Sequence, residues 1–478
     1  MLFNSIDFAI FLPIVFLLYW FVFKNNTKHQ NILLLLASYV FYGWWDYRFL
    51  SLIVISSVVD FIVGHHLDTT ETKVKRKLLL LVSIAINLGF LGFFKYYNFF
   101  AENFIQSFSL FGYKPTIETL TIVLPVGISF YTFQTLSYSI DIYRKKMKST
   151  KDVIAFFAFV SFFPQLVAGP IERACNLLPQ FKQRKLFNYK FATDGIRQII
   201  WGLFKKVVIA DSCAVYVNDI FANYSNYSGS TLMMGGILFA FQIYADFSGY
   251  SDIAIGTARL FGFNLMKNFA FPYFSRDIAE FWRRWHISLS TWFRDYVYIP
   301  LGGSRGNNIT KLRNILIIFI VSGFWHGANW TFVIWGFLNA LYFLPLLFSK
   351  LNRKNIDTVA QNRLFPTIKE IMQISVTFFL TVIAWIFFRA DNAEMAFLYL
   401  FKMFSVNFIS IPEVLPVILI GLIIILLVVE WFQRERNHGL EFEGYNIPFL
   451  LRYSICYSVI ILVLLHLGNK QEFIYFQF

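Results

Sequence analysis

The sequence predicts an all-α polytopic integral membrane protein, and three observations support this prediction. Hydrophobic residues make up 57% of the 478 positions and charged residues only 15%. The mean hydropathy is +0.56, and a water-soluble domain of this size does not normally tolerate such a surface. Apolar runs of membrane-spanning length alternate with short segments rich in Lys and Arg, as the positive-inside rule requires.

Charge and cysteine content exclude several other classes of protein. The net charge of +14 lies in the loops between apolar runs, so we interpret it as membrane topology and expect no nucleic-acid partner. The three cysteines are far apart and have neither metal-ligand nor disulfide spacing. We therefore expect no metal and no tightly bound cofactor, and membrane lipid as the surrounding medium.

The first third of the chain contains plain membrane spans. The predicted runs are Ile6–Phe23, Ile32–Trp45, Phe49–Val63, Leu78–Phe94 and Leu120–Tyr143. Positive charge follows the first run at Lys24, the third at Lys73–Lys77 and the fifth at Arg144–Lys151. The first run lacks a basic segment before it and a cleavage site after it, so we expect it to remain as a helix. Odd-numbered spans then end in the cytoplasm, and the N-terminus lies outside it.

The middle third is less regular. Phe156–Pro170 contains Pro164, Gly169 and Pro170, which predict a broken or re-entrant segment. Tyr189–Asn223 has the pattern of a long amphipathic helix, with two lysines, Lys205 and Lys206, at its polar edge.

Acidic side chains interrupt the next apolar run, Met233–Phe261. Asp246 and Asp252 are expected to be structural and to pair with Arg259 or with an Arg of another helix. His438, much later in the chain, lies in a polar segment and is expected to be solvated.

Ser275–Tyr296 shows helical periodicity, with apolar and aromatic residues at spacings of three and four. Asp277 and Glu280 form a candidate capping pair at its start. The pattern predicts one amphipathic helix near the membrane interface, with Trp285 on the apolar face and His286 at its border.

The apolar run Ile315–Phe348 is too long for one ordinary span of roughly 20 residues. We predict a break at Gly323–Asn329, which places His326 at the elbow. An ionisable residue at such depth is by default a functional candidate. The simpler alternative is a packed histidine that is hydrogen-bonded to a neighbouring helix, and it applies to both His286 and His326.

The last third returns to plain spans at Ile374–Phe388, Val414–Phe432 and Tyr453–Leu467. In total we expect about ten to twelve transmembrane or re-entrant helices. We expect one membrane-embedded domain, residues 1–478, with N-terminal spans to 150, a core of 151–348 and C-terminal spans from 349.

Histidine is the best candidate for chemistry in this chain. No P-loop, GxSxG, HExxH or kinase motif is present, and no cysteine lies near either histidine in sequence. A neutral imidazole can take the proton of a hydroxyl that attacks a thioester. A glycan transporter or ion-coupled carrier would also contain buried Asp, Arg and His, so it stays as an alternative from another class.

The motifs FWRRWHISLSTWFRDYVYIPLGG and SGFWHGANWTFVIWG closely resemble the membrane-bound O-acyltransferase (MBOAT) family, and specifically its bacterial branch of alginate and peptidoglycan O-acetyltransferase membrane subunits. The resemblance extends over nearly the whole chain and includes LPVGISFYTFQTLSYSIDIYR, FFPQLVAGPIER and FQIYADFSGYSDIAIG. It implies a many-helix fold with a funnel and tunnel that converge on His326, with His286 nearby. We expect these two histidines to be catalytic, and Trp285, Trp325 and Asn329 to bind substrate.

The resemblance also implies a reaction and its partners. An acyl group, usually acetyl, would pass from a cytoplasmic thioester such as acetyl-CoA towards an extracytoplasmic polysaccharide. A separate periplasmic or surface acetyltransferase would complete the transfer, and the expected location is the bacterial inner (cytoplasmic) membrane. Within the same family, D-alanyl transfer to teichoic acid from a carrier-protein thioester is the alternative.

Overall fold

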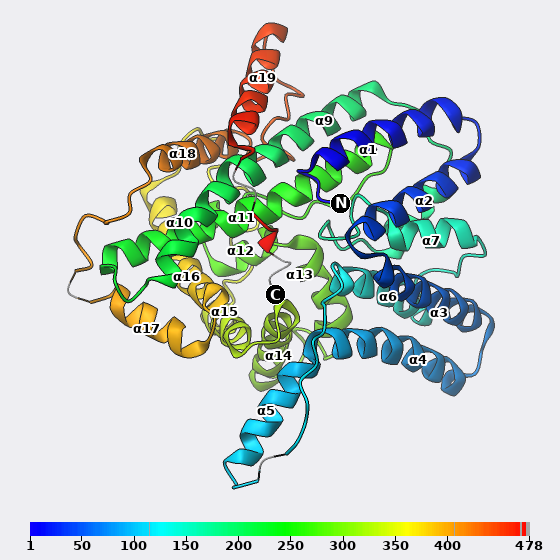
Figure 1. Ribbon diagram of the computed structural model, residues 1–478, viewed down its shortest axis with the longest axis horizontal. Coiled ribbons are helices and arrows are strands. Elements are labelled where there is room, and N and C mark those ends of the chain that lie inside the picture. Colours follow the sequence, from blue (N-terminus) through cyan, green and yellow to red (C-terminus); the bar gives the residue numbers. More distant parts are fainter. Residues whose placement is uncertain (114, 406, 469–470, 475–478) are drawn as a thin grey trace. The chain divides into compact units, whose positions relative to one another are not determined.

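The computed structural model describes residues 1–113, 115–405, 407–468 and 471–474, and within these residues the protein contains helices and no strands. The chain divides into two compact units (Figure 1). Unit 1 comprises Met1–Gly195 and Thr257–Met266, and unit 2 comprises Ile196–Gly256 and Lys267–Phe478. The prediction of an all-α protein is confirmed.

Unit 1 contains the N-terminal spans. Its helices are α1 (Ile6–Leu17, extended by a π-helical turn to Val22), α2 (Thr27–Asp46), α3 (Leu50–Thr69), α4 (Lys73–Leu91), α5 (Tyr97–Ser109), α6 (Ile128–Tyr143), α7 (Val153–Ser161) and α8 (Ala174–Lys182). The first four predicted spans are therefore confirmed to within a few residues. The fifth begins later than predicted, at Ile128, because Pro125 precedes it and Gly127 adopts a φ of 76°.

Three helices of unit 1, α3, α4 and α6, lie side by side (Figure 1). The carboxylate of Asp60 on α3 is buried among them. Asp60 accepts hydrogen bonds from the hydroxyls of Ser83 and Ser139 and from the amide of Asn87. These donors satisfy a polar group that the apolar surroundings would otherwise penalise. The broken segment predicted at Phe156–Pro170 is also confirmed, because α7 ends at Ser161 and a series of turns follows.

Unit 2 contains the two sequence motifs. Its helices are α10 (Asp211–Ala222), α12 (Ile278–Arg284), α13 (Ile287–Phe293), α14 (Asn308–His326), α15 (Trp330–Phe348), α16 (Ile368–Arg389), α17 (Ala393–Met403), α18 (Val417–Phe432) and α19 (Phe449–His466). Helices α9 (Tyr189–Leu203) and α11 (Gly229–Leu260) contribute residues to both units. A π-helical stretch at Phe204–Ala210 joins α9 to α10.

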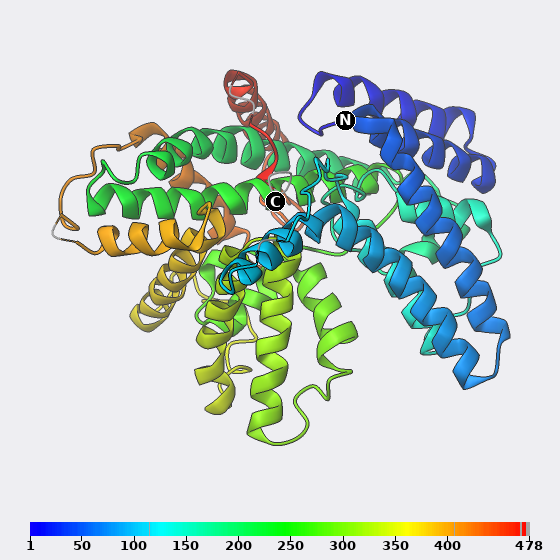
Figure 2. The ribbon, with the colours of Figure 1, turned by 60° about the horizontal axis from the view of Figure 1, so that its bottom comes forward.

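Helices α14 and α15 pack against each other along their length, and Figure 2 shows them side by side in yellow-green. Glycines permit this close approach. A Cβ atom on Gly323 would lie 2.2 Å from the carbonyl oxygen of Phe332, and one on Gly336 would lie 2.3 Å from that of Phe319. The predicted break between the two helices is confirmed, since α14 ends at His326 and the next residue is extended.

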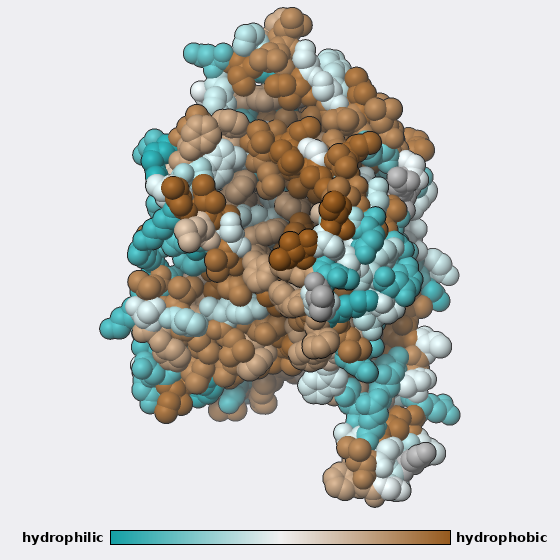
Figure 3. All heavy atoms as spheres, turned by 90° about the vertical axis from the view of Figure 1, so that its left-hand side faces the viewer, coloured by the Kyte–Doolittle hydropathy of each residue, from teal (hydrophilic) through white to brown (hydrophobic). Residues whose placement is uncertain are grey.

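Seven helical stretches among the described residues are long and apolar enough to cross a membrane, and two shorter apolar helices accompany them. Their outward faces are apolar, as lipid contact requires. In Figure 3, apolar side chains cover much of the face that carries α16 to α18. The protein is therefore a multi-pass membrane protein.

Candidate functional site

The segment that carries His286 is a broken helix, which corrects the prediction of a single amphipathic helix over Ser275–Tyr296. Helix α12 begins as expected, with the Asp277 carboxylate accepting from the Glu280 backbone N–H at 2.7 Å. It ends at Arg284, and α13 starts only at Ile287. Between them His286 adopts a left-handed backbone with a φ of 43°. For a residue other than glycine this costs about 1–3 kcal/mol, so surrounding contacts must impose it.

His286 is buried, with 1% of its surface exposed. Its Nδ1 atom lies 3.1 Å from Oδ1 of Asn268, and the edge of the Phe247 ring packs against the imidazole with the ring centroids 4.6 Å apart. Burial lowers the pKa of His286 from 6.5 to about 3. The imidazole is therefore neutral near pH 7 and can accept a proton or a hydrogen bond.

His326 ends α14, where the chain turns into α15. Aromatic rings surround it, with centroids 5.2 Å away at Trp335 and 5.3 Å away at Phe388. Trp335 in turn stacks on Trp385 of α16. This aromatic enclosure leaves 4% of the His326 surface exposed and keeps bulk water from the ring.

The two predicted catalytic histidines lie together, although 40 positions separate them in sequence. Their ring centroids are 6.4 Å apart. The ring centroid of Trp325 lies 4.9 Å from that of His326 and 6.1 Å from that of His286. A hydroxyl and a carbonyl compound positioned here would meet two imidazoles, the side chains that most often act in general acid–base catalysis.

The remaining predicted substrate-binding residues occupy different positions. Trp285 is buried and packs between Phe281 and Trp385, so it supports the helix break from inside. Asn329 caps α15 by accepting from the Thr331 N–H, and its amide donates to the carbonyl of Asp391. Contact of either residue with substrate stays a prediction.

A network of ion pairs holds α12 to the loop that precedes α16. Glu280 accepts from Arg276 and Arg284, and Arg276 also donates to the carboxylate of Asp357. Hydrogen bonding to Arg276 lowers the pKa of Asp357. The adjacent arginines of the RRWH motif therefore fix the backbone that leads to His286.

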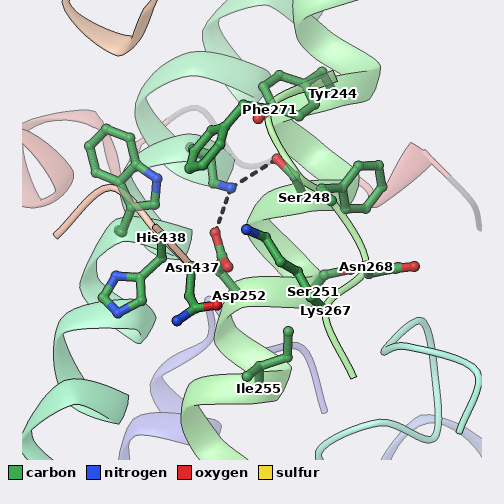
Figure 4. A pocket seen from close by; sticks show the side chains of 13 residues that line it. Tyr244, Ser248, Ser251, Asp252, Ile255, Lys267, Asn268, Phe271, Asn437 and His438 are labelled. Carbon is green, nitrogen blue, oxygen red and sulfur yellow. Dashed lines mark hydrogen bonds and ion pairs between the residues drawn. The ribbon is translucent and has the colours of Figure 1, made fainter. Parts of the chain in front are cut away.

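A second polar cluster joins α11 to the π-helical stretch Phe204–Ala210, and Figure 4 shows part of it, including Ser248 and Asp252. Lys205 is held by Asp252 at 2.5 Å and donates to Ser248 at 2.9 Å. Lys206 pairs with Asp211 and Asp246. The predicted arginine partners of Asp246 and Asp252 are thus wrong, since lysines from the preceding π-helical stretch neutralise them and Arg259 pairs with Asp194 instead.

Sequence reasoning placed three residues of this region wrongly and gave no signal for a fourth, Asn268. Lys205 and Lys206 are buried rather than at a polar edge, and His438 is 1% exposed rather than solvated. The apolar VVIA stretch that directly follows the two lysines was the available sign that they are buried. Helical periodicity alone does not show whether such lysines lie in the core or on the polar face of an amphipathic helix. Asn268 gave no signal, because a single Asn between apolar residues resembles a loop.

A cavity of about 560 Å³ lies between α12, α13, α14 and α15. Its wall is mainly apolar. Neither histidine is among its lining residues, but Ile287, which follows His286 in sequence, and Ser322, one turn before His326 on α14, both line it. Three arginines line it: Arg283, Arg294 and Arg353. The shape suits a ligand that has a chain of apolar or neutral character and an anionic end.

Among the described residues, no group of three or more His, Cys, Asp or Glu side chains is placed to hold a metal ion.

Comparison with known proteins gives a consistent result. A model of the MBOAT, membrane-bound O-acyltransferase family matches residues 146–388, which include both histidines. The chain is 39% identical over 424 residues to the probable alginate O-acetylase AlgI of Pseudomonas aeruginosa, covering 88% of this chain and 78% of that protein. It is 36% identical over 440 residues to the peptidoglycan O-acetyltransferase of Helicobacter pylori, covering 86% and 81%. The teichoic acid D-alanyltransferase of Bacillus subtilis is 28% identical over 242 residues, covering 48% and 60%.

Proposed function

Because this chain belongs to the membrane-bound O-acyltransferase family and is an O-acyltransferase, we propose that it moves an acetyl group from a cytoplasmic thioester towards an extracytoplasmic polysaccharide, with His326 as the general base. The observation that carries the proposal is the pairing of His286 and His326 in one buried aromatic enclosure. The names of the relatives favour acetyl, since the two O-acetylating relatives match most of the chain and the D-alanylating one matches about half.

The chemical step requires little beyond a base and a dry, positioned donor. A nitrogen of His326 takes the proton of the acceptor hydroxyl while the hydroxyl oxygen attacks the thioester carbonyl carbon. The tetrahedral intermediate then collapses, the C–S bond breaks, and the departing thiolate recovers a proton from the imidazolium. A general base of this kind typically contributes ~10²–10⁴-fold to the rate.

The cavity beside the histidines is our candidate for the donor path. Acyl thioesters of the coenzyme A type carry phosphates at one end, and arginine is well suited to hold phosphate. Arg283, Arg294 and Arg353 line the cavity at the end where α14 begins and α15 stops. Basic residues gather in the loops at this end, so the positive-inside rule supports a cytoplasmic mouth.

The same rule supports a cytoplasmic membrane location with an extracytoplasmic N-terminus. A separate extracytoplasmic acetyltransferase is the proposed partner that delivers the acetyl group to the final glycan position. The acceptor of this chain is then either the glycan itself or a hydroxyl of that partner.

Inside-out membrane vesicles that contain the protein test the donor. We expect transfer of radiolabel from acetyl-CoA to a base-labile ester, and no transfer of D-alanine from a carrier-protein thioester. As a matched pair, Arg353→Ala should raise the KM for acetyl-CoA, whereas Lys28→Ala, an exposed cation of unit 1, should leave it unchanged. Transfer of D-alanine alone would contradict the proposed donor.

A further inference from the structure

Asn268 lies between the buried polar cluster and His286 and has none of its surface exposed. It follows α11 and comes 18 positions before the histidine it contacts. Its side-chain amide makes hydrogen bonds in two directions: Oδ1 faces the α12–α13 break, and Nδ2 donates to the hydroxyl of Ser251 at 3.0 Å. In Figure 4 this amide extends away from the carboxylate of Asp252.

The orientation of the amide follows from its neighbours. The backbone N–H of Ser288 lies 3.3 Å from the atom that faces the break, and a backbone N–H can only donate. That atom must therefore be the oxygen, and the hydroxyl of Ser288 donates to it as well, at 2.9 Å. An amide oxygen accepts and does not donate. The Nδ1 atom of His286, 3.1 Å away, must then carry the proton.

A neutral imidazole has one N–H, so a proton on Nδ1 leaves the lone pair on Nε2. The same asparagine also restrains the backbone. The N–H of Ile287 donates to the Asn268 carbonyl at 2.8 Å, and the N–H of Ala270 donates to the carbonyl of Arg284 at 2.9 Å. These bonds lie on both sides of His286 and explain why its left-handed conformation persists.

We propose that Asn268 is a positioning residue for acyl transfer: its amide oxygen selects the Nδ1–H tautomer of His286, so that Nε2 serves as the hydrogen-bond acceptor in the reaction. This inference rests on the proposed function of the histidine pair. The ionisable groups around this contact are His326 on the side of the imidazole, and Lys205, Asp252 and Lys267 on the side of the amide. On the side of the amide, Ser251 accepts from Nδ2 of Asn268 and directly precedes Asp252, which pairs with Lys205.

The first test reads the tautomer without any activity assay. The chain contains seven histidines, and ¹⁵N-histidine labelling of the purified full-length protein, with His286→Ala to assign the signals, shows which ring nitrogen of His286 carries the proton. We expect a protonated Nδ1 in the native protein and a mixture of tautomers in Asn268→Leu. A protonated Nε2 in the native protein would overturn the inference, whatever the enzyme's substrate.

The second test is kinetic and compares three variants at equal amounts of assembled protein. Asn268→Leu removes the acceptor, so kcat should fall by about 10- to 100-fold, the loss typical when the hydrogen-bond partner that orients a metal-binding imidazole is removed. Asn268→Asp keeps an oxygen acceptor for Nδ1–H and should retain most of kcat. Its added negative charge raises the pKa of His286, so the acid limb of the pH–rate profile should move to higher pH.

Asn31→Leu is the matched control, because Asn31 is also buried but its amide donates to the backbone carbonyl of Phe181 in unit 1. Its loss should change thermal stability and leave the pH–rate profile in place. A native rate in Asn268→Leu would overturn the proposal, as would an Asn268→Asp variant that is as slow as Leu with an unmoved profile. Failure of the native protein to transfer any acyl group would instead contradict the proposed function.

Discussion

At the scale of single residues, the site depends on two buried histidines. His286 is held in a strained backbone conformation by Asn268, and His326 is enclosed by Trp335, Phe388 and Trp325. Such strain survives only where neighbouring contacts over-determine the conformation. The strained left-handed backbone conformation of His286 therefore helps to set the direction of its imidazole.

The pKa of His286 gives a prediction about stability. In the folded protein it is lowered from 6.5 to about 3, so below pH 6.5 the unfolded chain binds a proton that the folded chain does not. The free energy of unfolding should then decrease as the pH falls from about 6.5 towards 3, with a contribution of about 2 kcal/mol lost at pH 5. Thermal unfolding in detergent at pH 7 and pH 5 measures it.

The variant His286→Asn removes this titration and should lose less stability on acidification than the native protein. His65→Asn replaces an exposed histidine and should behave like the native protein. Equal acid sensitivity in all three proteins would show that His286 is not buried as described.

Residue type and local context were enough to identify the two histidines as candidates for the functional site. Each interrupts an otherwise apolar or aromatic segment, where an ionisable group is costly. It did not predict Asn268. A side chain that acts through a hydrogen bond across 18 positions has no periodic signature, and only the folded chain brings the two together.

At the scale of elements, sequence pattern predicted one helix break and missed another. The turn after His326 follows from length, since Ile315–Phe348 exceeds one span and contains Gly323 and Gly327. The break at His286 was missed because apolar spacing continues through it without interruption. There, tertiary bonds from Asn268 override local helix propensity.

The close packing of α14 on α15 yields a prediction at this scale. Gly323→Ala places a methyl group where the backbone carbonyl of Phe332 lies, 2.2 Å from the new Cβ. The helices must separate, so the yield of folded protein and the unfolding temperature should both drop. Size-exclusion chromatography and thermal unfolding in detergent measure the two effects.

Gly421→Ala provides the control for this glycine. Gly421 lies within α18, and nothing approaches within 4 Å of its Cβ position. Alanine is a better helix former than glycine by about 1 kcal/mol, so this variant should be as stable as the native protein or more so. If both alanine variants unfold alike, the glycine contact between α14 and α15 is not limiting.

At the scale of the whole molecule, composition and the positions of basic residues predict a membrane orientation with the N-terminus outside the cytoplasm. The N-terminal spans are separated by a short turn after α2 and by a short link, residues 70–72, between α3 and α4. Tyr47 in that turn is 76% exposed. Lys73–Lys77 form the start of α4 rather than a loop, and their positive charge predicts that the link before α4 lies in the cytoplasm.

Cysteine labelling from outside the cell tests this topology in a variant that lacks the three native cysteines. An impermeant reagent should label Tyr47→Cys on intact cells and should label Thr72→Cys only after the membrane is permeabilised. The opposite labelling pattern would show that the protein has the reverse orientation in the membrane. The proposed mouth of the donor cavity would then lie outside the cytoplasm.

The most direct test of the account is acyl transfer by His326→Gln, compared with His65→Gln as a matched replacement of an exposed histidine. Glutamine retains similar size and hydrogen-bonding capacity but cannot take a proton near neutral pH. With both proteins inserted at native levels, the account predicts that His326→Gln loses ~10²–10⁴-fold in O-acetylation and that His65→Gln retains the native rate. A native rate of acetylation in His326→Gln would contradict the role of His326 as the general base.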